Sequence, residues 1–395
     1  MFRRALILTL LLATLNRAHA QWDLEDSTTT ADLRGIHSVG GDIAWASGTN
    51  GTVLRTEDGG YIWQHCSAPP GAEHLDFRGI QAFDANTAIV MSSGKGDLSR
   101  IYKTTDGCHT WKLLFTNPYS PDGFFDALLF LDSQHGILLG DPSPLNMNTP
   151  TEYPNDIRLR VTADGGVTWG PISAPDAMRP GTGLHALGDE AAFAASNSSI
   201  DSNNGRFWLA TSTARVSSRR LYLHPEQLQF LFQSSFCAGA LDPVSKECGQ
   251  PWTDFQDAHA PINHSAPSAG IFSIHFRSEQ NGVVVGGNYS KPEDPSATAA
   301  YSADSGGTWL PAQTPPHGYR SSVAYDPATK TWITVGPNGT DISTDDGRTW
   351  RAVHPNPALH QPPDADRNWN ALSLPFVVGP HGRIAKLNTQ SLAAR

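Results

Sequence analysis

Charged residues with the potential for binding chemistry recur at matching places along the sequence. Arg34, Arg78 and Asp126 each stand at the start of a β-type run, and Arg320 is displaced from the matching place by about one residue. If these places converge in the fold, the arginines can grip a carboxylate through paired hydrogen bonds. They can equally well pair with Asp126 and neighbouring acids and fill a channel with satisfied polar groups. Both interpretations stay open.

Further polar residues fall in loops that we expect on the same face. The candidate ligand-binding set is therefore Arg34, Arg78, Asp126, Asp141, Asn197, Asn288, Arg320 and Asn370. Asp126 and Asp141 also form the alternative catalytic pair, because a glycoside hydrolase needs two carboxylates across its sugar. Two acids from one unit more often shape loops, so we predict no catalytic residue. No Cys/His cluster indicates a metal and no glycine-rich loop indicates a dinucleotide, so we predict neither metal nor cofactor.

A repeated octapeptide indicates the elements that position these residues. The pattern Ser/Thr-x-Asp-x-Gly-x-Thr/Ile-Trp occurs five times, with Cys108 in the glycine place of one copy. Asp and Gly are typical of tight turns, and a Trp that begins the next strand can bury its ring between sheets. We therefore assign structural roles to Asp58 and Trp63, Asp106 and Trp111, Asp164 and Trp169, Asp304 and Trp309, and Asp345 and Trp350.

Two short β-type runs precede each octapeptide. They lie at 35–39 and 43–47, 80–83 and 88–91, 128–131 and 136–139, 271–276 and 282–285, and 322–325 and 332–335. Each unit is predicted to hold four strands, and four-stranded units at this period are typical of a β-propeller. A degenerate unit from about residue 181, with a loop at 196–206, and a final unit near residue 370 bring the count to seven.

The final unit is one strand short, and the segment that begins at Gln21 and Trp22 can supply the missing strand. A ring closed in this way leaves no exposed sheet edge. We predict an all-β, seven-bladed propeller with four-stranded blades, in which the N-terminal strand joins the C-terminal blade. Residues 21–395 form one domain, with an irregular insert at about 219–268 in or after the fourth blade.

The first twenty residues have the features of a secretory signal peptide. Arg3 and Arg4 precede an apolar run, and Ala18-His19-Ala20 has the form of a signal-peptidase site. The apolar run is well short of the roughly 20 residues that span a bilayer. We therefore expect an exported protein, periplasmic or secreted, without a membrane span.

Charge and cysteine content narrow the partners further. Without the leader, which carries three arginines and no acid, 25 basic residues face 38 acidic ones and the net charge is −13. Such a chain offers no basic surplus for nucleic acid. Cys237 and Cys248, close together in the insert, are the expected disulfide in an oxidising compartment, and a Cys66 to Cys108 pair would link neighbouring repeats.

The octapeptide resembles the Asp-box, or BNR repeat, of sialidases, other Asp-box glycosidases and the photosystem II stability/assembly factor propellers. With the export signal and seven units, segments 282–289, 318–325 and 378–385 look most like the secreted bacterial relatives of the assembly factor. This resemblance implies one seven-bladed propeller and a chaperone-like role in holding a membrane-protein subunit during assembly. Sialidases have six blades and an early Arg-Ile-Pro signature, which this sequence lacks.

The expected function is that of an exported, non-catalytic, monomeric propeller. It would bind a protein or peptide partner on the face that carries the loops between second and third strands. The resemblance to assembly factors implies a partner associated with the cell envelope. The alternatives are an Asp-box glycoside hydrolase and a lectin-like sugar binder. Trp208 and Tyr289 are the only nearby aromatic residues that could stack on a sugar.

Overall fold

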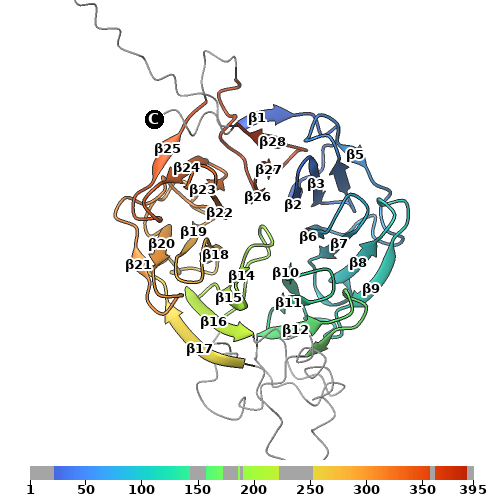
Figure 1. Cartoon of the computed structure of the whole chain (residues 1–395), viewed down its shortest axis with the longest axis horizontal. Coiled ribbons are helices and arrows are strands. Elements are labelled where there is room, and N and C mark those ends of the chain that lie inside the picture. The colour runs from blue at the N-terminus through green and yellow to red at the C-terminus, as the bar shows by residue number, and fades with distance from the viewer. Residues whose placement is uncertain are drawn as a thin grey trace, which may run out of the picture.

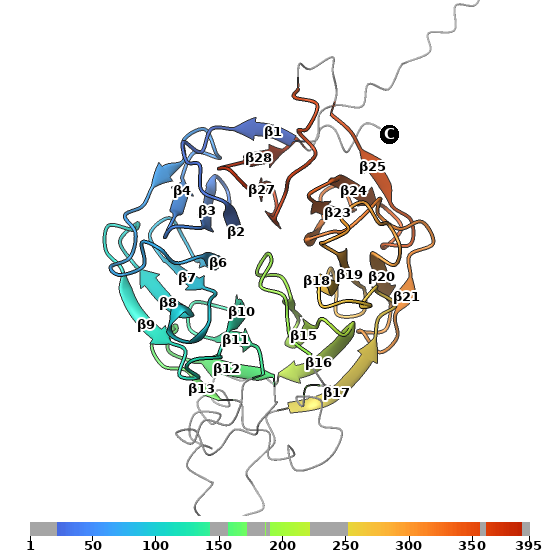
Figure 2. The same cartoon turned by 180° about the vertical axis from the view of Figure 1, so that it is seen from behind.

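The described part of the chain folds into seven antiparallel sheets of four strands each, arranged as blades around a central channel (Figures 1 and 2). In six of these sheets the strands follow one another in sequence order from the channel to the rim. The predicted all-β, seven-bladed propeller is therefore confirmed. The computed structural model describes residues 22–142, 157–171, 186, 190–221, 252–355 and 361–388.

The blades are numbered here in chain order. Blades 1 to 4 contain β2–β5 (Leu33–Gly40, Ile43–Gly48, Val53–Thr56, Gln64–His65), β6–β9 (Phe77–Ala82, Ala88–Ser92, Arg100–Thr104, Lys112–Thr116), β10–β13 (Phe125–Phe130, Gly136–Gly140, Arg158–Thr162, Gly170–Pro171) and β14–β17 (Ile200–Asn203, Arg206–Ala210, Arg215–Leu221, Trp252–His259). Blades 5 to 7 contain β18–β21 (Ala269–Phe276, Gly282–Asn288, Ala299–Ser302, Leu310–Pro311), β22–β25 (Ser322–Asp326, Thr331–Gly336, Gly339–Ser343, Arg351–Val353) and β26–β28 (Ala371–Ser373, Phe376–Val378, Ile384–Leu387) with β1 (Trp22–Glu25). A short 3-10 helix, η1 (Gly96–Leu98), precedes β8. Across the described ranges no helix has the length and apolar character needed to cross a membrane.

The ring is closed by β1, which forms the outermost strand of blade 7. It pairs antiparallel with β28, with Trp22 opposite Leu387. The Trp22 side chain is 1% exposed and lies 6.1 Å from the Trp369 ring, measured between centroids. Its indole Nε1 donates a 3.0 Å hydrogen bond to Thr340 Oγ1 on β24 of blade 6. The predicted closure by the N-terminal strand is thus confirmed.

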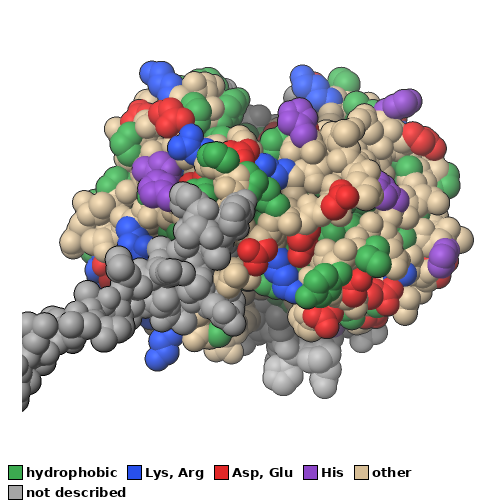
Figure 3. All heavy atoms as spheres, turned by 90° about the horizontal axis from the view of Figure 1, so that it is seen from above, with side chains coloured by type: hydrophobic (Ala, Val, Ile, Leu, Met, Phe, Trp, Pro, Cys, Tyr) green, Lys and Arg blue, Asp and Glu red, His purple; other side chains and the backbone are tan. Residues whose placement is uncertain are grey.

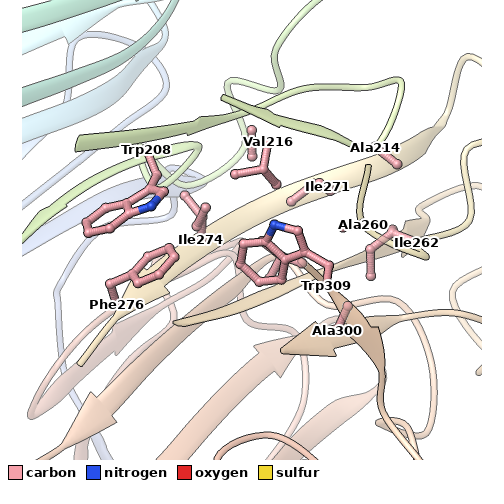
Figure 4. Close-up of a cluster of buried hydrophobic side chains, with 12 residues drawn as sticks. Trp208, Ala214, Val216, Ala260, Ile262, Ile271, Ile274, Phe276, Ala300 and Trp309 are labelled. Atoms are coloured by element: carbon pink, nitrogen blue, oxygen red, sulfur yellow. The ribbon is translucent and has the colours of Figure 1, made fainter. Parts of the chain in front are cut away.

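Neighbouring blades are held together by apolar clusters, of which the one between blades 4 and 5 is shown in Figure 4. Trp208 of β15 stacks face to face on Phe276 of β18, with ring centroids 3.6 Å apart. Trp309, which belongs to an octapeptide turn, meets Phe276 edge-on at 5.9 Å. Trp208 is fully buried in this cluster and donates to Ser305 O at 2.7 Å, so it cannot serve as a sugar platform.

The octapeptide forms the same turn in all five copies. After β4, Thr56 Oγ1 accepts a 3.0 Å hydrogen bond from the Gly60 N–H, and Asp58 Oδ1 accepts one of 3.0 Å from the Ile62 N–H. The other four turns repeat both contacts. Four of the octapeptide tryptophans are buried between blades, namely Trp63, Trp169, Trp309 and Trp350. The fifth, Trp111, is only partly buried.

A disulfide joins two neighbouring blades. Cys108 stands in the glycine place of its octapeptide with a φ of 67°, and it is bonded to Cys66, which follows β5. The bridge therefore ties the outer edge of blade 1 to the turn of blade 2. The other expected pair, Cys237 and Cys248, lies outside the described residues, as does the proposed signal peptide.

Blade 4 departs from the predicted boundaries. The expected irregular insert, 219–268, is wrong at both ends, because β16 runs on to Leu221 and Trp252–His259 forms β17, the outer strand. The two strands pair from Arg215 opposite His259 to Leu221 opposite Trp252. The blade has no octapeptide between its third and fourth strands, so its sequence carries no marker for this hairpin.

Replacing Trp22 with Ala tests the closure of the ring. Because the Trp22 indole is fully buried and donates a hydrogen bond to the neighbouring blade, the variant should lose roughly 3–5 kcal/mol of unfolding free energy. Chemical denaturation followed by tryptophan fluorescence measures this loss. Leu24→Ala on the same strand is the control, since Leu24 is 39% exposed and its loss should cost far less. Equal costs for the two variants would contradict closure through Trp22.

Reduction of the Cys66–Cys108 bridge should destabilise the ring. The bonded residues are separated by 42 positions, and chain entropy predicts a cost of about 4 kcal/mol for a loop of this size. Denaturation of wild type and of a Cys66→Ser, Cys108→Ser variant, each with and without reductant, measures the effect. Any further loss in the reduced variant would report on the other two cysteines. A wild-type curve that reductant leaves unchanged would exclude this bridge.

Candidate cavity at the channel mouth

The innermost strands of four blades carry a β-bulge at the same place. The pairing registers of β2, β6, β10 and β18 with their neighbours each skip one residue, namely Arg34, Arg78, Asp126 and Phe272. A bulge redirects the side chain of the extra residue away from the regular alternation of a strand. The structure therefore gives the first three residues the equivalent positions that their spacing predicts, and it adds Phe272 to the series.

A cavity of about 420 Å³ lies at one end of the channel. Tyr289 and Pro337, which follow the second strands of blades 5 and 6, line it, so it is on the face with the loops between second and third strands. Its other lining residues are Arg34, Arg78, Phe193, Ala194, Ala195, Phe272, Tyr319, Ser321, Trp369 and Asn370. Three predicted residues, Arg34, Arg78 and Asn370, are thus brought together.

Arg320 is not part of this cavity. Its side chain is fully buried, and its guanidinium donates to Asp341, Asn338 and the Tyr319 carbonyl. Burial without such partners would be costly for a charge, so this arginine has a structural role. In the sequence, Arg320 is displaced by one residue from the position that Arg34 and Arg78 hold in their blades. The next residue, Ser321, lines the cavity instead.

Arg78 is partly committed to structural contacts. Its Nε donates to Asp76 Oδ2 at 2.8 Å, and its Nη1 donates to the carbonyl of Ala194 at 3.2 Å. These bonds fix the guanidinium between blade 2 and the segment that precedes β14. Arg78 therefore supplies positive charge to the cavity while holding part of its wall.

Arg34 is the least committed of the three arginines. Its nearest acids are Asp32 and Asp76, each with an oxygen 3.9 Å from a guanidinium nitrogen. Its Nε is buried and has no hydrogen-bond partner among the described residues, although the side chain is 30% exposed. A guanidinium donates through five N–H groups, so Arg34 retains donors for a ligand.

The chain before β14 projects into the channel (Figures 1 and 2), and its residues 193–195 line the cavity. Ser196 Oγ donates to Ser321 O of blade 6 at 2.8 Å, and Ser198 Oγ donates to Ser273 Oγ of blade 5 at 2.7 Å. We call residues 191–199 the plug. Together with the Arg78 contact, these bonds anchor the plug to opposite sides of the ring.

Asn197 belongs to the plug, and its predicted place in a loop between second and third strands, at 196–206, is wrong. Its Oδ1 accepts from Leu128 N at 2.8 Å and its Nδ2 donates to Leu128 O at 2.9 Å. The loop between the second and third strands of blade 4 is 211–214 instead. Asn197 therefore completes the hydrogen bonding of the inner strand of blade 3 and does not line the cavity.

The two remaining asparagines differ in position. Asn288 is 6% exposed, and its Oδ1 accepts from Ser268 Oγ and the Ser290 N–H, so it shapes a loop beside the cavity. Asn370 lines the cavity itself, and its Nδ2 donates to Leu33 O at 2.8 Å. Its side chain thereby ties blade 7 to the strand that carries Arg34.

Asp126 and Asp141 form a carboxyl pair in blade 3, with Asp126 fully buried and Asp141 partly buried. Asp126 is 1% exposed. Burial, and next the negative charge of Asp141, raise the pKa of Asp126 well above its ordinary range, although Arg78 opposes the shift. Burial raises the pKa of Asp141 to about 6, against the opposing hydrogen bond from the Ala192 N–H. The folded structure therefore favours the protonated form of both carboxyls.

This arrangement does not favour the catalytic alternative. A glycoside hydrolase needs two accessible carboxyls roughly 5–9.5 Å apart with a sugar between them. Here Asp126 is fully enclosed and the two carboxyls act directly on each other's pKa. Within the described residues, no group of three or more His, Cys, Asp or Glu side chains is placed to hold a metal ion.

The aromatic wall of the cavity is the main feature that the residue pattern did not predict. Phe193 stacks on Phe272 with centroids 3.8 Å apart, and Tyr319 meets Phe272 edge-on at 4.7 Å. Tyr289, 53% exposed, completes the wall 6.0 Å from Phe272. Alignment of the fifth unit on the bulge would have identified Phe272, whereas Phe193 lies in the degenerate fourth unit and has no such marker.

The fold and the cavity define the chain as a closed seven-bladed β-propeller with a polar and aromatic cavity at its channel mouth. Two solved structures that share this fold are YCF48 bound to D1 peptide, with a TM-score of 0.57, 16% identity and coverage of 95% of this chain and 99% of that one, and YCF48 from Cyanidioschyzon merolae, with a TM-score of 0.56, 16% identity and coverage of 94% and 100%. The WD40 β-propeller domain of Doa1 is similar at a TM-score of 0.52 and 9% identity, over 93% of this chain and 96% of that domain. No protein-family model and no curated protein matches the chain.

Replacing Asp126 with Asn tests the buried pair. When folding raises the pKa of a carboxyl, the group costs no stability at a pH below its pKa in the unfolded chain, near 3.9. The cost grows as the pH rises from there toward the pKa of the group in the folded protein. The variant should therefore gain stability over wild type between pH 4 and pH 8, by on the order of 1–3 kcal/mol. Urea denaturation across this range measures the difference.

The matched control for this prediction is Asp122→Asn, which changes an exposed aspartate near the start of the same blade. Its stability curve should run parallel to the wild-type curve at every pH. If the Asp126→Asn curve were also parallel to wild type, Asp126 would be ionised in the folded protein and the assigned pKa direction would be wrong.

Proposed function

We propose that this chain is an exported, non-catalytic propeller that binds a segment of a partner protein at the channel mouth, similar in role to assembly-factor propellers. The observation that carries this proposal is the pairing of a 420 Å³ cavity with Arg34, whose Nε has no hydrogen-bond partner among the described residues and whose nearest acid oxygens are 3.9 Å from its guanidinium. Ligand sites commonly enclose roughly 300–1,000 Å³ and place a few polar groups on an apolar wall. This cavity has that composition.

The shared fold is a further reason to test a peptide. In one of the similar structures, YCF48 is bound to D1 peptide. A propeller of the same architecture, with loops of variable length on one face, offers the same kind of scaffold for a polypeptide. The identity of 16% leaves the partner of the present chain to be determined by experiment.

The surface charge is consistent with a protein partner. On the side of the ring that carries β1, Lys and Arg are interspersed with Asp and Glu, without a continuous basic stripe (Figure 3). Binding to nucleic acid draws on clustered positive charge that displaces counterions. A protein segment with one anionic group needs only the local charge of the cavity.

The Cys66–Cys108 bridge supports the proposed export, since disulfides persist in oxidising compartments.

The hydrolase and lectin alternatives have weaker support. In the only carboxyl pair near the channel that the sequence singled out, Asp126 is fully buried, and of the two aromatic residues named for a lectin only Tyr289 reaches the cavity. A neutral sugar stacked on Tyr289 would also leave Arg34 without a role. We therefore place both alternatives behind the partner binder.

A peptide array drawn from envelope proteins of the host tests the proposal. The purified mature protein should bind a subset of peptides, and an Arg34→Gln, Arg78→Gln variant should bind them roughly 10–100-fold more weakly, because each loses charge-assisted hydrogen bonds. The control is Arg348→Gln, since Arg348 is exposed on an octapeptide turn at the opposite face. Thermal melts establish that each variant is folded.

Two outcomes would overturn the proposal. One is an array on which no peptide binds, or on which the double variant binds as well as wild type. The other is hydrolysis of a sialoside or another member of a glycan panel that Asp126→Asn or Asp141→Asn abolishes, which would support the glycoside hydrolase instead.

A further inference from the structure

The cavity has two chemically different halves. Blades 7, 1 and 2 contribute Asn370, Arg34 and Arg78, with the Trp369 side chain beside them only 1% exposed, whereas the plug and blade 5 contribute Phe193, Phe272 and Tyr289. Tyr319, which precedes β22, extends the second half toward blade 6. A ligand that filled the cavity would therefore meet hydrogen-bond donors and positive charge on one side and aromatic rings on the other.

The aromatic half retains surface for a further ring. Phe272 is 2% exposed because Phe193 and Tyr319 cover it, but Tyr289 stays 53% exposed and Phe193 is partly exposed. Tyr289 and Tyr319 also lie close, with centroids 6.5 Å apart. Aromatic pairs prefer offset or edge-on contacts at centroid distances of roughly 4.5–7 Å, and the partly open rings leave such a contact available.

The two halves are near enough to be engaged together. Arg34, Tyr289 and Tyr319 all line the same cavity of about 420 Å³. This volume lies near the lower end of the roughly 300–1,000 Å³ of small-ligand sites, so a ligand that fills it reaches residues on both sides. A small ligand can therefore touch the Arg34 guanidinium and the aromatic wall at once.

The positive charge also decides the kind of ligand. Aromatic walls often bind cations, but the charged side chains that line this cavity are Arg34 and Arg78, and among the described residues no carboxylate lines it to favour a cation. Carboxylate oxygens accept hydrogen bonds from guanidinium groups in a paired geometry. Asp32 and Asp76, each 3.9 Å from Arg34, are not close enough to use its donors fully.

We propose that the cavity recognises a carboxylate adjacent to an aromatic side chain on the partner segment, with the carboxylate on Arg34 and the ring against Tyr289 and Phe193. This inference rests on the proposed function and adds the chemistry of the recognised residue. The carboxylate can come from two sources, a free chain terminus or an acidic side chain next to the aromatic residue.

Four short synthetic peptides separate these possibilities. The first, Ac-Gly-Ser-Gly-Ser-Phe, has a free terminal carboxylate, and the second is the same peptide as its amide. The third is the amide of Ac-Gly-Ser-Gly-Asp-Phe, and the fourth is the free acid with Ala in place of Phe. Isothermal titration calorimetry should give a Kd in the high-micromolar to millimolar range for the first or the third. The second and fourth should bind at least tenfold more weakly.

The variants assign the two halves. Arg34→Gln should remove the advantage of the carboxylate, and Tyr289→Ala should remove the advantage of Phe over Ala. The matched controls are Arg348→Gln and Tyr61→Ala, because both residues are exposed on octapeptide turns and Tyr61 is 89% exposed. Both controls should bind the peptides as wild type does.

Each outcome decides the inference. Binding of the first peptide alone assigns the carboxylate to a chain terminus, and binding of the third alone assigns it to a side chain. The inference is overturned if the second or fourth peptide binds as tightly as the best of the set, or if none binds. In the latter case, an array peptide that binds and depends on Arg34 would leave the proposed function standing, while an array without binders would remove both.

Discussion

Burial of apolar side chains between adjacent blades is the constraint on which the rest of the structure depends. Each sheet has two faces, and both must be covered by neighbours, as Trp208 and Phe276 are covered between blades 4 and 5. The last sheet can satisfy this requirement only if the chain returns to its beginning, and β1 provides that return through Trp22. The channel mouth is thus held by a scaffold in which every blade is fixed on both sides.

On this scaffold, a recurring backbone irregularity helps to determine what the channel presents. In four of the seven blades a bulge near the start of the inner strand leaves one residue outside the regular pairing, and the type of that residue changes from arginine to aspartate to phenylalanine around the ring. Because the bulge is set by the backbone, the side chain can change without disturbing the sheet. The same fold can therefore carry unrelated binding chemistries.

The residue pattern predicted the repeats, the blade count and the closure well, because each depends on turn chemistry and alternation that are local in the chain. It predicted less where the repeat is degenerate. Blade 4 has no octapeptide, so Asn197 was placed in the wrong loop, β17 was assigned to the irregular insert, and the plug was not predicted. Arg320 was misassigned because a displacement of one residue moves a side chain from the channel to the space between strands. Candidates chosen for polarity also left out Phe193, Phe272 and Tyr319, whose role comes from packing.

The plug limits what can pass along the central channel. Residues 191–199 are bonded to blades on opposite sides of the channel, through Arg78, Leu128, Ser273 and Ser321. The plug therefore narrows the middle of the disc, and a polypeptide passing along the axis would have to displace a segment that these bonds hold in place. A ligand held at the mouth of the channel needs no such displacement.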